Sequence, residues 1–331
     1  MTEVVTDTDI ALDAIQRYPD ADNPSAYFAF SGGNSYFRLP DEPGLIVYRR
    51  TGRYLVQFGG PFAPAAARTR LLRGFAGFAA DRGLEIVAVQ VQSADAPAFV
   101  DEGFIVNQMG ASYAVELDGF TLRGTRFMQL RNKISRALRA GLEIREASYD
   151  DWREQIGALD AQWLRGKGED VKALEFLVGE LGGRHQPLRR LFVAVQGGRL
   201  IGYISYSPVY GSRPGWMHDL SRRRPDSPPG VMEAINKAAI DVFTTEKVPW
   251  LHFGFTPFTS LDAPRFPGYS RAFHWFMTYL WEEGAHIYPA RTQLAYKEKW
   301  APNLVLPEYI AFQGQASLAA LVHVFRACNA I

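Results

Sequence analysis

The chain has 331 residues, 47% of them hydrophobic and 21% charged, so it can bury a core and is not of the disordered class. Its one cysteine, Cys328, excludes a disulfide framework and a cysteine-based metal site. The formal net charge of +1 hides segments of −6 over residues 1–120, +7 over 121–230 and 0 over 231–331. A polyanionic partner for the middle segment therefore stays open.

The sequence contains no targeting or membrane-spanning pattern. No apolar run approaches the roughly 18–20 residues of a membrane span. Residues 1–22 are acidic and lack the basic and apolar regions of a signal peptide. We expect a cytoplasmic protein, with peripheral contact at the inner membrane face as a further option. The six histidines are scattered without metal-ligand spacing, so no metal site is expected.

Strand and helix patterns alternate along the chain and repeat in a similar order. In the first half we predict strands at 44–48 and 53–58 about a turn at 50–52, a helix at 65–82, a strand at 85–91, a helix at 94–102 and a strand at 112–117. The second half repeats this with a helix at 150–181, a hairpin of 191–195 and 200–205, a strand at 217–220, helices at 228–245 and 270–283 flanking a strand at 250–255, and a terminal strand and helix. Two α/β domains with mixed sheets are therefore expected, 1–142 and 143–331.

A basic helix is predicted between the two halves. Residues 121–142 contain six basic side chains and no acidic one. Apolar residues fall on one side at helical spacing, and Gly141 is a suitable stop. The opposite side carries Arg126, Lys133, Arg136 and Arg139. Solvated helices usually interleave acidic residues at i, i+4. The pattern therefore favours contact with tRNA phosphates or anionic lipid head groups over a merely solvated face.

The segment 215–232 is the most unusual in the chain. A strand ends at Asp219, arginines follow at 222–224, and Ser227 with Pro228 predicts the start of a helix. A helix N-terminus beside arginines suits an anion, although an Asp219–Arg222 ion pair bracing the loop is the alternative. In acetyl-coenzyme A-dependent acyltransferases of the GNAT type, this turn carries Q/R-x-x-G-x-G/A. Here prolines remove backbone donors, so coenzyme A is not expected to bind in that way.

From about Leu45 to Phe312 the chain resembles the catalytic domain of the phosphatidylglycerol lysyltransferase family. The motifs that carry the resemblance are Gly52-Arg53, Gly59-Gly60-Pro61, Gly103-Phe104, Met109-Gly110, Leu130-Arg131-Asn132 through Arg139-Ala140-Gly141, Trp216–Arg224 running into Pro229-Gly230-Val231-Met232, and Tyr296-Lys297-Glu298-Lys299-Trp300-Ala301-Pro302. The resemblance implies two tandem GNAT-like domains and aminoacyl-tRNA as the donor, without a further cofactor. The family's membrane-embedded half has no counterpart here, so the acceptor stays open between a phosphatidylglycerol-like lipid and a small amine or hydroxylamine.

The same resemblance implies roles for individual residues. Asp219 is expected to bind the α-ammonium group of the donor, and Arg222 to lie near the ester or an acceptor phosphate. One of Lys297 and Lys299 would stabilise the developing oxyanion or protonate the leaving oxygen. Residues two apart on a helix point about 200° from each other, so only one can face the site, and Lys297 is favoured. The other expected substrate-binding residues are Trp216, His218, Arg223 and Gly230.

Two other functions remain as hypotheses. One is an acyl-coenzyme A-dependent N-acyltransferase on the same fold, which the altered turn argues against. The other is a non-catalytic module that binds tRNA or membranes. The aromatic-rich helix at 270–283 is typical of a core element, but it would also suit the lining of an acyl-chain channel.

Overall fold

The structure is a computed structural model that describes residues 3–19, 22–168, 172–286 and 288–331. Within these residues, twelve strands form one continuous sheet. The strands of the first half are β1 (Glu3–Val5), β2 (Ser35–Arg38), β3 (Leu45–Thr51), β4 (Tyr54–Phe62), β5 (Glu85–Gln92) and β6 (Phe104–Glu116). Those of the second half are β7 (Glu143–Ala147), β8 (Arg190–Gln196), β9 (Arg199–Val209), β10 (Gly215–Arg223), β11 (Trp250–Pro257) and β12 (Leu304–Gln313).

The strand order reveals two equivalent halves that exchange their last strands. From one edge it runs β1-β2-β3-β4-β5-β12, and from the other β7-β8-β9-β10-β11-β6. Each half has one parallel pair, β4–β5 or β10–β11, and the neighbouring pairs are antiparallel. The long β6 therefore leaves the first half to pair with β11, and β12 returns to pair with β5. The predicted α/β class with a mixed sheet is confirmed, and the expected boundary at residue 142 remains a prediction.

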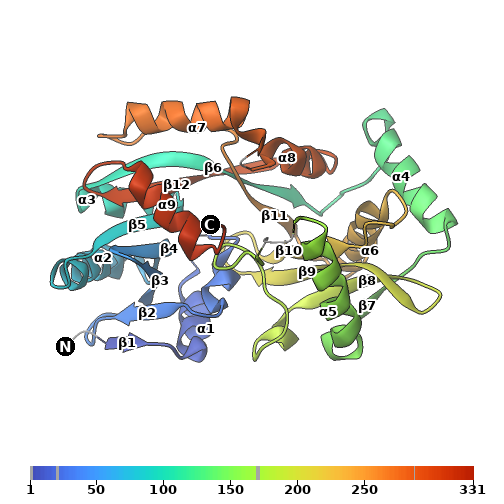
Figure 1. Cartoon of the computed structure of the whole chain (residues 1–331), viewed down its shortest axis with the longest axis horizontal. Coiled ribbons are helices and arrows are strands. Elements are labelled where there is room, and N and C mark those ends of the chain that lie inside the picture. The colour runs from blue at the N-terminus through green and yellow to red at the C-terminus, as the bar shows by residue number, and fades with distance from the viewer. Residues whose placement is uncertain (1–2, 20–21, 169–171, 287) are drawn as a thin grey trace.

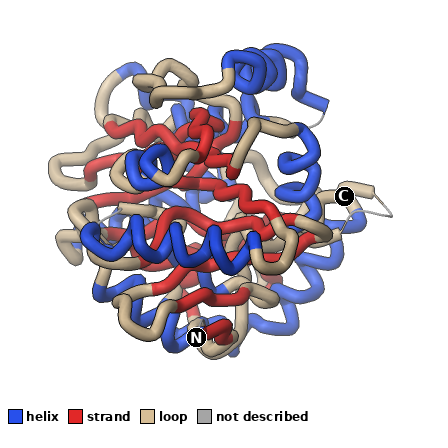
Figure 2. The backbone as a smooth tube through the Cα atoms, turned by 90° about the vertical axis from the view of Figure 1, so that its left-hand side faces the viewer, coloured by secondary structure: helices blue, strands red, loops and turns tan. Residues whose placement is uncertain are grey.

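Helices cover both faces of the sheet (Figures 1 and 2). They are α1 (Thr8–Arg17), α2 (Ala65–Ala80), α3 (Ala96–Asp101), α4 (Met128–Arg139), α5 (Tyr149–Arg165), α6 (Val231–Thr245), α7 (Arg271–Glu283), α8 (Ala290–Glu298) and α9 (Leu318–Ala327). In the first half α2 and α9 pack on opposite faces of β3–β5. Each helix has its own apolar cluster, because alternate residues of a strand point to opposite faces of the sheet. In the second half α6 and α5 do the same on β9 and β10.

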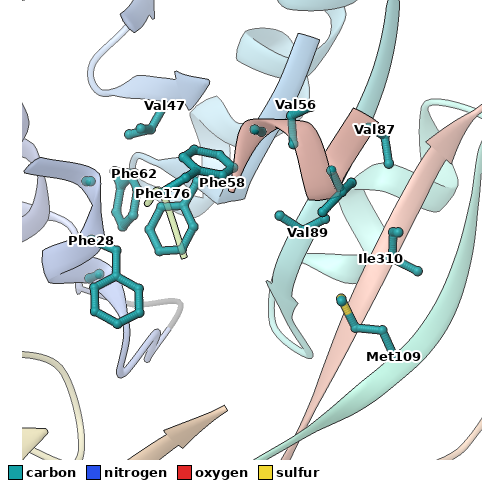
Figure 3. Packing of buried hydrophobic residues seen from close by; sticks show 14 of the residues in the cluster. Phe28, Val47, Val56, Phe58, Phe62, Val87, Val89, Met109, Phe176 and Ile310 are labelled. Carbon is teal, nitrogen blue, oxygen red and sulfur yellow. The ribbon is translucent and has the colours of Figure 1, made fainter. Parts of the chain in front are cut away.

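The largest apolar cluster joins segments that are far apart in the chain. Phe176 lies in the irregular segment between α5 and β8, is fully buried, and packs edge-to-face on Phe58 of β4 at 6.2 Å between ring centroids. Figure 3 shows the Phe176 ring beside Phe58 and Phe62. Arg49 of β3 also pairs with Glu175 at 2.9 Å. The segment 174–181 is thus anchored to the first half, although it precedes a strand of the second.

Most predicted elements are present, with four corrections to their bounds or packing. The helix predicted over 150–181 ends at Arg165, and residues 169–171 of that prediction lie outside the described residues. The strand predicted at 112–117 begins at Phe104. The N-cap of α6 is Gly230 in the left-handed conformation, so Ser227 as its cap was wrong. The strand expected to end at Asp219 continues to Arg223, so Asp219 lies within β10 and not at its end.

Candidate active site

A cavity opens where the parallel strands of the second half separate. Strands β10 and β11 pair only at residues 215–217 with 250–252, and both continue beyond that point. The cavity between them has a volume of about 760 Å³. Its lining is mostly apolar and comes largely from β10, β11, the segment 174–178, α7, α8 and α9, with further residues from β5, β6 and the 3-10 helix Ala26–Phe30. The apolar side chains of the lining include Phe28, Met109, Phe253, Phe255, Phe258, Phe273, Met277, Leu321, Val324 and Phe325. Such walls suit an apolar ligand portion.

Two β-bulges set the polar end of this cavity. The register of β10 against β9 shifts between His218 and Leu220, and that of β11 against β6 shifts between His252 and Gly254. Gly254 has φ +68°, a backbone conformation that favours glycine. Bulges re-aim side chains and free backbone groups from the ladder. As a result His218 and Asp219 line the cavity from β10, and Lys297 lines it from α8.

Asp219 is a buried carboxylate with one ionic partner. Its side chain is 0% exposed, and Oδ2 accepts a hydrogen bond from Nε of Arg189 at 3.4 Å. Oδ1 has no hydrogen-bond partner among the described residues. Burial raises the pKa of Asp219 to about 6, and the Arg189 guanidinium opposes this rise. The ion pair is therefore with Arg189, and the alternative interpretation of an Asp219–Arg222 brace is wrong.

Gly179 leaves the space that Asp219 occupies. A Cβ built on Gly179 would lie 1.7 Å from Oδ1 and 2.4 Å from Cγ of Asp219. Neighbouring Glu180 accepts hydrogen bonds from the Gly32 amide at 3.2 Å. The segment 174–181 thus covers Asp219 on one side, and the cavity is the side from which a ligand can reach it.

Lys297 is the cation of the site. The residue is 6% exposed, and its Nζ donates hydrogen bonds to the carbonyl oxygens of Gly254 at 2.6 Å and Phe255 at 3.0 Å. The Tyr113 ring lies 5.6 Å from Nζ. Burial lowers the pKa of Lys297 to about 7, against the opposing effect of Glu308. At neutral pH this lysine can therefore either donate or release a proton.

His218 lines the cavity beside Asp219 and packs among aromatic rings. Its ring lies 5.7 Å from that of Tyr206 and 5.9 Å from that of Tyr296. Burial lowers its pKa to about 3, with a further contribution from Lys297. The imidazole is thus neutral at physiological pH and a weak base. Its buried Nδ1 has no hydrogen-bond partner among the described residues, so it can bind a polar group of a ligand.

The structure separates the two lysines and places Arg222 away from the cavity. Lys299 Nζ donates to Glu233 on α6 at 2.9 Å and does not line the cavity among the described residues. The geometry agrees with only one lysine facing the site. The Arg222 guanidinium lies 3.9 Å from the centroid of the Trp163 ring on α5 and is likewise outside the lining.

The other expected substrate-binding residues contact the protein itself. Trp216 stacks on Phe243 of α6 at 5.9 Å between centroids. Arg223 donates a hydrogen bond to Ser227 at 2.8 Å. A Cβ on Gly230 would lie 2.2 Å from the carbonyl oxygen of Lys133, so α4 sits directly on the start of α6. Among the described residues, only His218 of the four lines the cavity.

The basic face of α4 is on the surface, as predicted. Lys133, Arg136 and Arg139 lie on α4 and Arg126 in the short 3-10 turn just before it, and all four are exposed. Lys133 lies 3.9 Å from Glu233, and Arg139 donates to the carbonyl of Ser135 within its own helix. These four residues are apart from the cavity lining, so their part in binding stays a prediction.

Sequence reasoning missed several residues of the site. The residues not singled out are Arg189, Gly179, Gln90 and Glu308, because none belongs to a recognisable local pattern and only the fold brings them together. Gln90 has φ +53° and lines the cavity from β5, on which no bulge was expected. Among the described residues, no group of three His, Cys, Asp or Glu side chains could hold a metal. No helix in the same part of the chain is long and apolar enough to cross a membrane.

The first half contains the same split in closed form. Strands β4 and β5 pair in parallel only up to Phe58 and Val89. Beyond this point Asp95 fills the gap, since a Cβ on Gly60 would lie 2.1 Å from its Oδ2. Arg68 pairs with Asp95 at 3.3 Å in the interior. The units β4–α2–β5 and β10–α6–β11 are each a strand–helix–strand unit whose parallel strands separate, and this arrangement defines the GNAT-like α/β class. In the second unit the gap between the strands opens into the cavity.

Comparison with known proteins identifies the family within this class. The chain belongs to the family described as phosphatidylglycerol lysyltransferase, C-terminal, whose model matches residues 14–312. It is 23% identical over 314 residues to a phosphatidylglycerol lysyltransferase of Bacillus subtilis (strain 168), covering 90% of this chain and 34% of that relative. The chain therefore spans about a third of the length of this relative.

Two solved structures share the whole fold. L-PGS from Bacillus licheniformis superposes with a TM-score of 0.80 at 19% identity, covering 98% of this chain and 97% of that one. The C-terminal domain of a lysylphosphatidylglycerol synthetase from Agrobacterium fabrum superposes with a TM-score of 0.79 at 20% identity, covering 98% of each chain. At these identities the likeness establishes the fold.

Proposed function

We propose that this chain transfers an aminoacyl group from aminoacyl-tRNA to a hydroxyl group of a phospholipid head group. The observation that carries the proposal is the cavity at the split of β10 and β11, where a buried carboxylate and a buried lysine meet a long apolar wall. Membership of the family supports the transferase class. The apolar wall favours a lipid acceptor over a small soluble amine, because burying apolar ligand surface contributes about 25 cal/mol per Å².

The reaction is the exchange of one ester for another. The acceptor oxygen attacks the carbonyl carbon of the aminoacyl ester, the bond to the ribose oxygen breaks, and the acceptor proton ends on that ribose oxygen. An aminoacyl ester is already activated, so the site has to orient the two substrates and stabilise the oxyanion of the tetrahedral intermediate.

The residues of the cavity divide these tasks. Asp219 binds the α-ammonium group of the donor through Oδ1, which no protein group occupies among the described residues. Lys297 donates its remaining N–H to the oxyanion or to the leaving oxygen, since two of its three N–H groups are held by Gly254 and Phe255. His218 is neutral and positions the acceptor hydroxyl.

The exposed basic face of α4 is the proposed contact for the phosphates of the donor tRNA or for anionic lipid heads. Arg136 and Arg139 are the residues to test, because Lys133 is partly occupied by Glu233. Charge reversal of both should weaken binding of tRNA and reduce the dependence of that binding on salt concentration. The proposal places the chain at the cytoplasmic face of the membrane as a peripheral protein.

Coenzyme A is disfavoured as the donor by the packing at the start of α6. A pyrophosphate needs free backbone N–H groups at that helix N-terminus. Here the Lys133 carbonyl lies against Gly230, and prolines occupy positions 225, 228 and 229. A melting-temperature shift with acetyl-coenzyme A, and none with charged tRNA, would favour the acyl-coenzyme A alternative.

The direct test is a transfer assay with purified protein. A mixed pool of charged tRNA is combined with vesicles of phosphatidylglycerol, vesicles of phosphatidylcholine, or soluble amines and hydroxylamine, and products are identified by mass spectrometry. We expect aminoacylated phosphatidylglycerol, loss of product with Lys297→Met, and retention of product with the matched variant Lys299→Met. If only the soluble amine or hydroxylamine is aminoacylated, the acceptor is a small molecule and not a lipid. If no acceptor is aminoacylated, the proposal is refuted.

A further inference from the structure

Glu308 is a buried acid that the proposed chemistry leaves without a task. It lies on β12, the exchanged strand, and is 0% exposed. Ser112 of β6 donates a hydrogen bond to its Oε1, and the Gln92 side chain of β5 also lies close enough to the carboxylate to favour its charged form. Burying a carboxylate without an ionic contact costs free energy. A nearby positive charge would offset this cost.

Lys297 supplies that charge, and it too is held in the interior without a direct ionic contact. Its two hydrogen-bond partners, Gly254 and Phe255, are neutral carbonyl groups. Burial of an ammonium among neutral groups favours loss of its proton. Phe255, whose carbonyl accepts from Lys297, is paired across the sheet with Ser112 of β6, and Ser112 donates to Glu308. The Glu308 carboxylate therefore lies on the far side of this residue pair from the ammonium, and its charge opposes loss of the proton.

The other titratable groups around Lys297 are neutral or have their negative charge offset by a basic partner. Tyr113 on β6 faces the ammonium with its ring. Tyr296 on α8 has a pKa raised by burial and stays neutral. His218 on β10 is neutral as well, and Asp219, which also lines the cavity, is paired with Arg189. Lys299 and Glu233 form their own pair.

We propose that Glu308 is a positioning residue for Lys297: its buried carboxylate keeps Lys297 protonated, and hence a hydrogen-bond donor toward the cavity, at neutral pH. The inference rests on the proposed function for its catalytic meaning, but the pairing itself can be tested without any turnover. Burial raises the pKa of Glu308 to about 7 and the Ser112 hydrogen bond opposes that rise, so Ser112 helps to keep the carboxylate charged. The pair therefore titrates as a unit near neutral pH.

The test is the titration of Lys297 itself, followed by NMR of protein labelled with ¹³C at the lysine ε-carbon. The chain has seven lysines, and Lys297→Arg assigns the signal. In Glu308→Gln, which keeps the shape and the Ser112 contact, we expect Lys297 to lose its proton about one pH unit or more lower than in the wild type. The matched control is Glu298→Gln, an exposed neighbour in sequence, which should leave the titration unchanged.

A second variant guards against a folding failure of the first. Ser112→Ala removes a hydrogen-bond donor to Glu308. It should also lower the pH at which Lys297 loses its proton, but by less than Glu308→Gln does. An unchanged or higher titration pH in the folded variants would overturn the inference.

Transfer rates separate this inference from the proposed function. In Glu308→Gln the rate should fall with rising pH at a lower pH than in the wild type, because the donor ammonium is lost earlier. A shifted titration in a protein that transfers nothing would reject the proposed function alone, whereas normal transfer with an unshifted titration would reject the role of Glu308.

Discussion

Gly179→Ala tests whether the position of Asp219 depends on the segment that covers it. The added Cβ would lie 1.7 Å from Oδ1 of Asp219, and an ordinary carbon–oxygen contact is about 3.4 Å, so one of the two groups must move by more than an ångström. Asp219 has little room, because its side chain is 0% exposed and bound to Arg189. Overpacking of this kind costs about 1–3 kcal/mol, and each kcal/mol lowers the melting temperature by roughly 2–4 °C in proteins somewhat smaller than this one.

The measurement is thermal unfolding by calorimetry or fluorescence, with Gly157→Ala as the control. Gly157 lies on the exposed side of α5, and its added Cβ would meet no atom within 4 Å. That variant should be as stable as the wild type or up to about 1 kcal/mol more stable. In the transfer assay Gly179→Ala should lose activity through the displaced carboxylate. A Gly179→Ala protein that melts at the wild-type temperature and transfers at the wild-type rate would refute the reasoning.

Three further outcomes follow from the same geometry. The folded-state pKa of Asp219, about 6, lies above its usual 3.8, so the wild-type protein loses stability as pH rises from about 4 to 7 and the buried carboxyl becomes charged. The melting temperature of Asp219→Asn minus that of the wild type should therefore increase across this pH range. A difference that stays constant with pH would contradict the raised pKa. Gly230→Ala should lower the melting temperature more than Gly119→Ala does, because both glycines have positive φ but only the Cβ added at position 230 would meet the Lys133 carbonyl. Equal melting temperatures of the two variants would show that the close contact between α4 and α6 does not matter for stability. Lys299→Met should lower the free energy of unfolding, measured by chemical denaturation, by less than about 1 kcal/mol, because the ion pair of Lys299 with Glu233 is partly exposed. A larger loss would mean that this ion pair contributes to stability like a buried one.

The local sequence was enough to predict the elements and one end of the site. Glycine, proline and apolar spacing located the hairpin β3–β4, the helix α2 and the strand β11 because these signals act within a few residues. Helical geometry alone made Lys297 and Lys299 alternatives, and the structure places only Lys297 at the cavity. The start of α6 was misjudged, since packing against α4 selected Gly230 over Ser227 as the cap.

The sequence by itself determined a chain of alternating α/β elements in two similar halves, with a basic helix between them and Asp219 on a strand of the second half. Only the tertiary structure decided that β6 and β12 change places, which brings Glu308 within electrostatic reach of Lys297. It also decided that Asp219 pairs with Arg189 and that residues 174–181 cover it. The physical reason is that strand exchange, bulges and burial depend on contacts between residues far apart in the chain, on which local propensity has no influence.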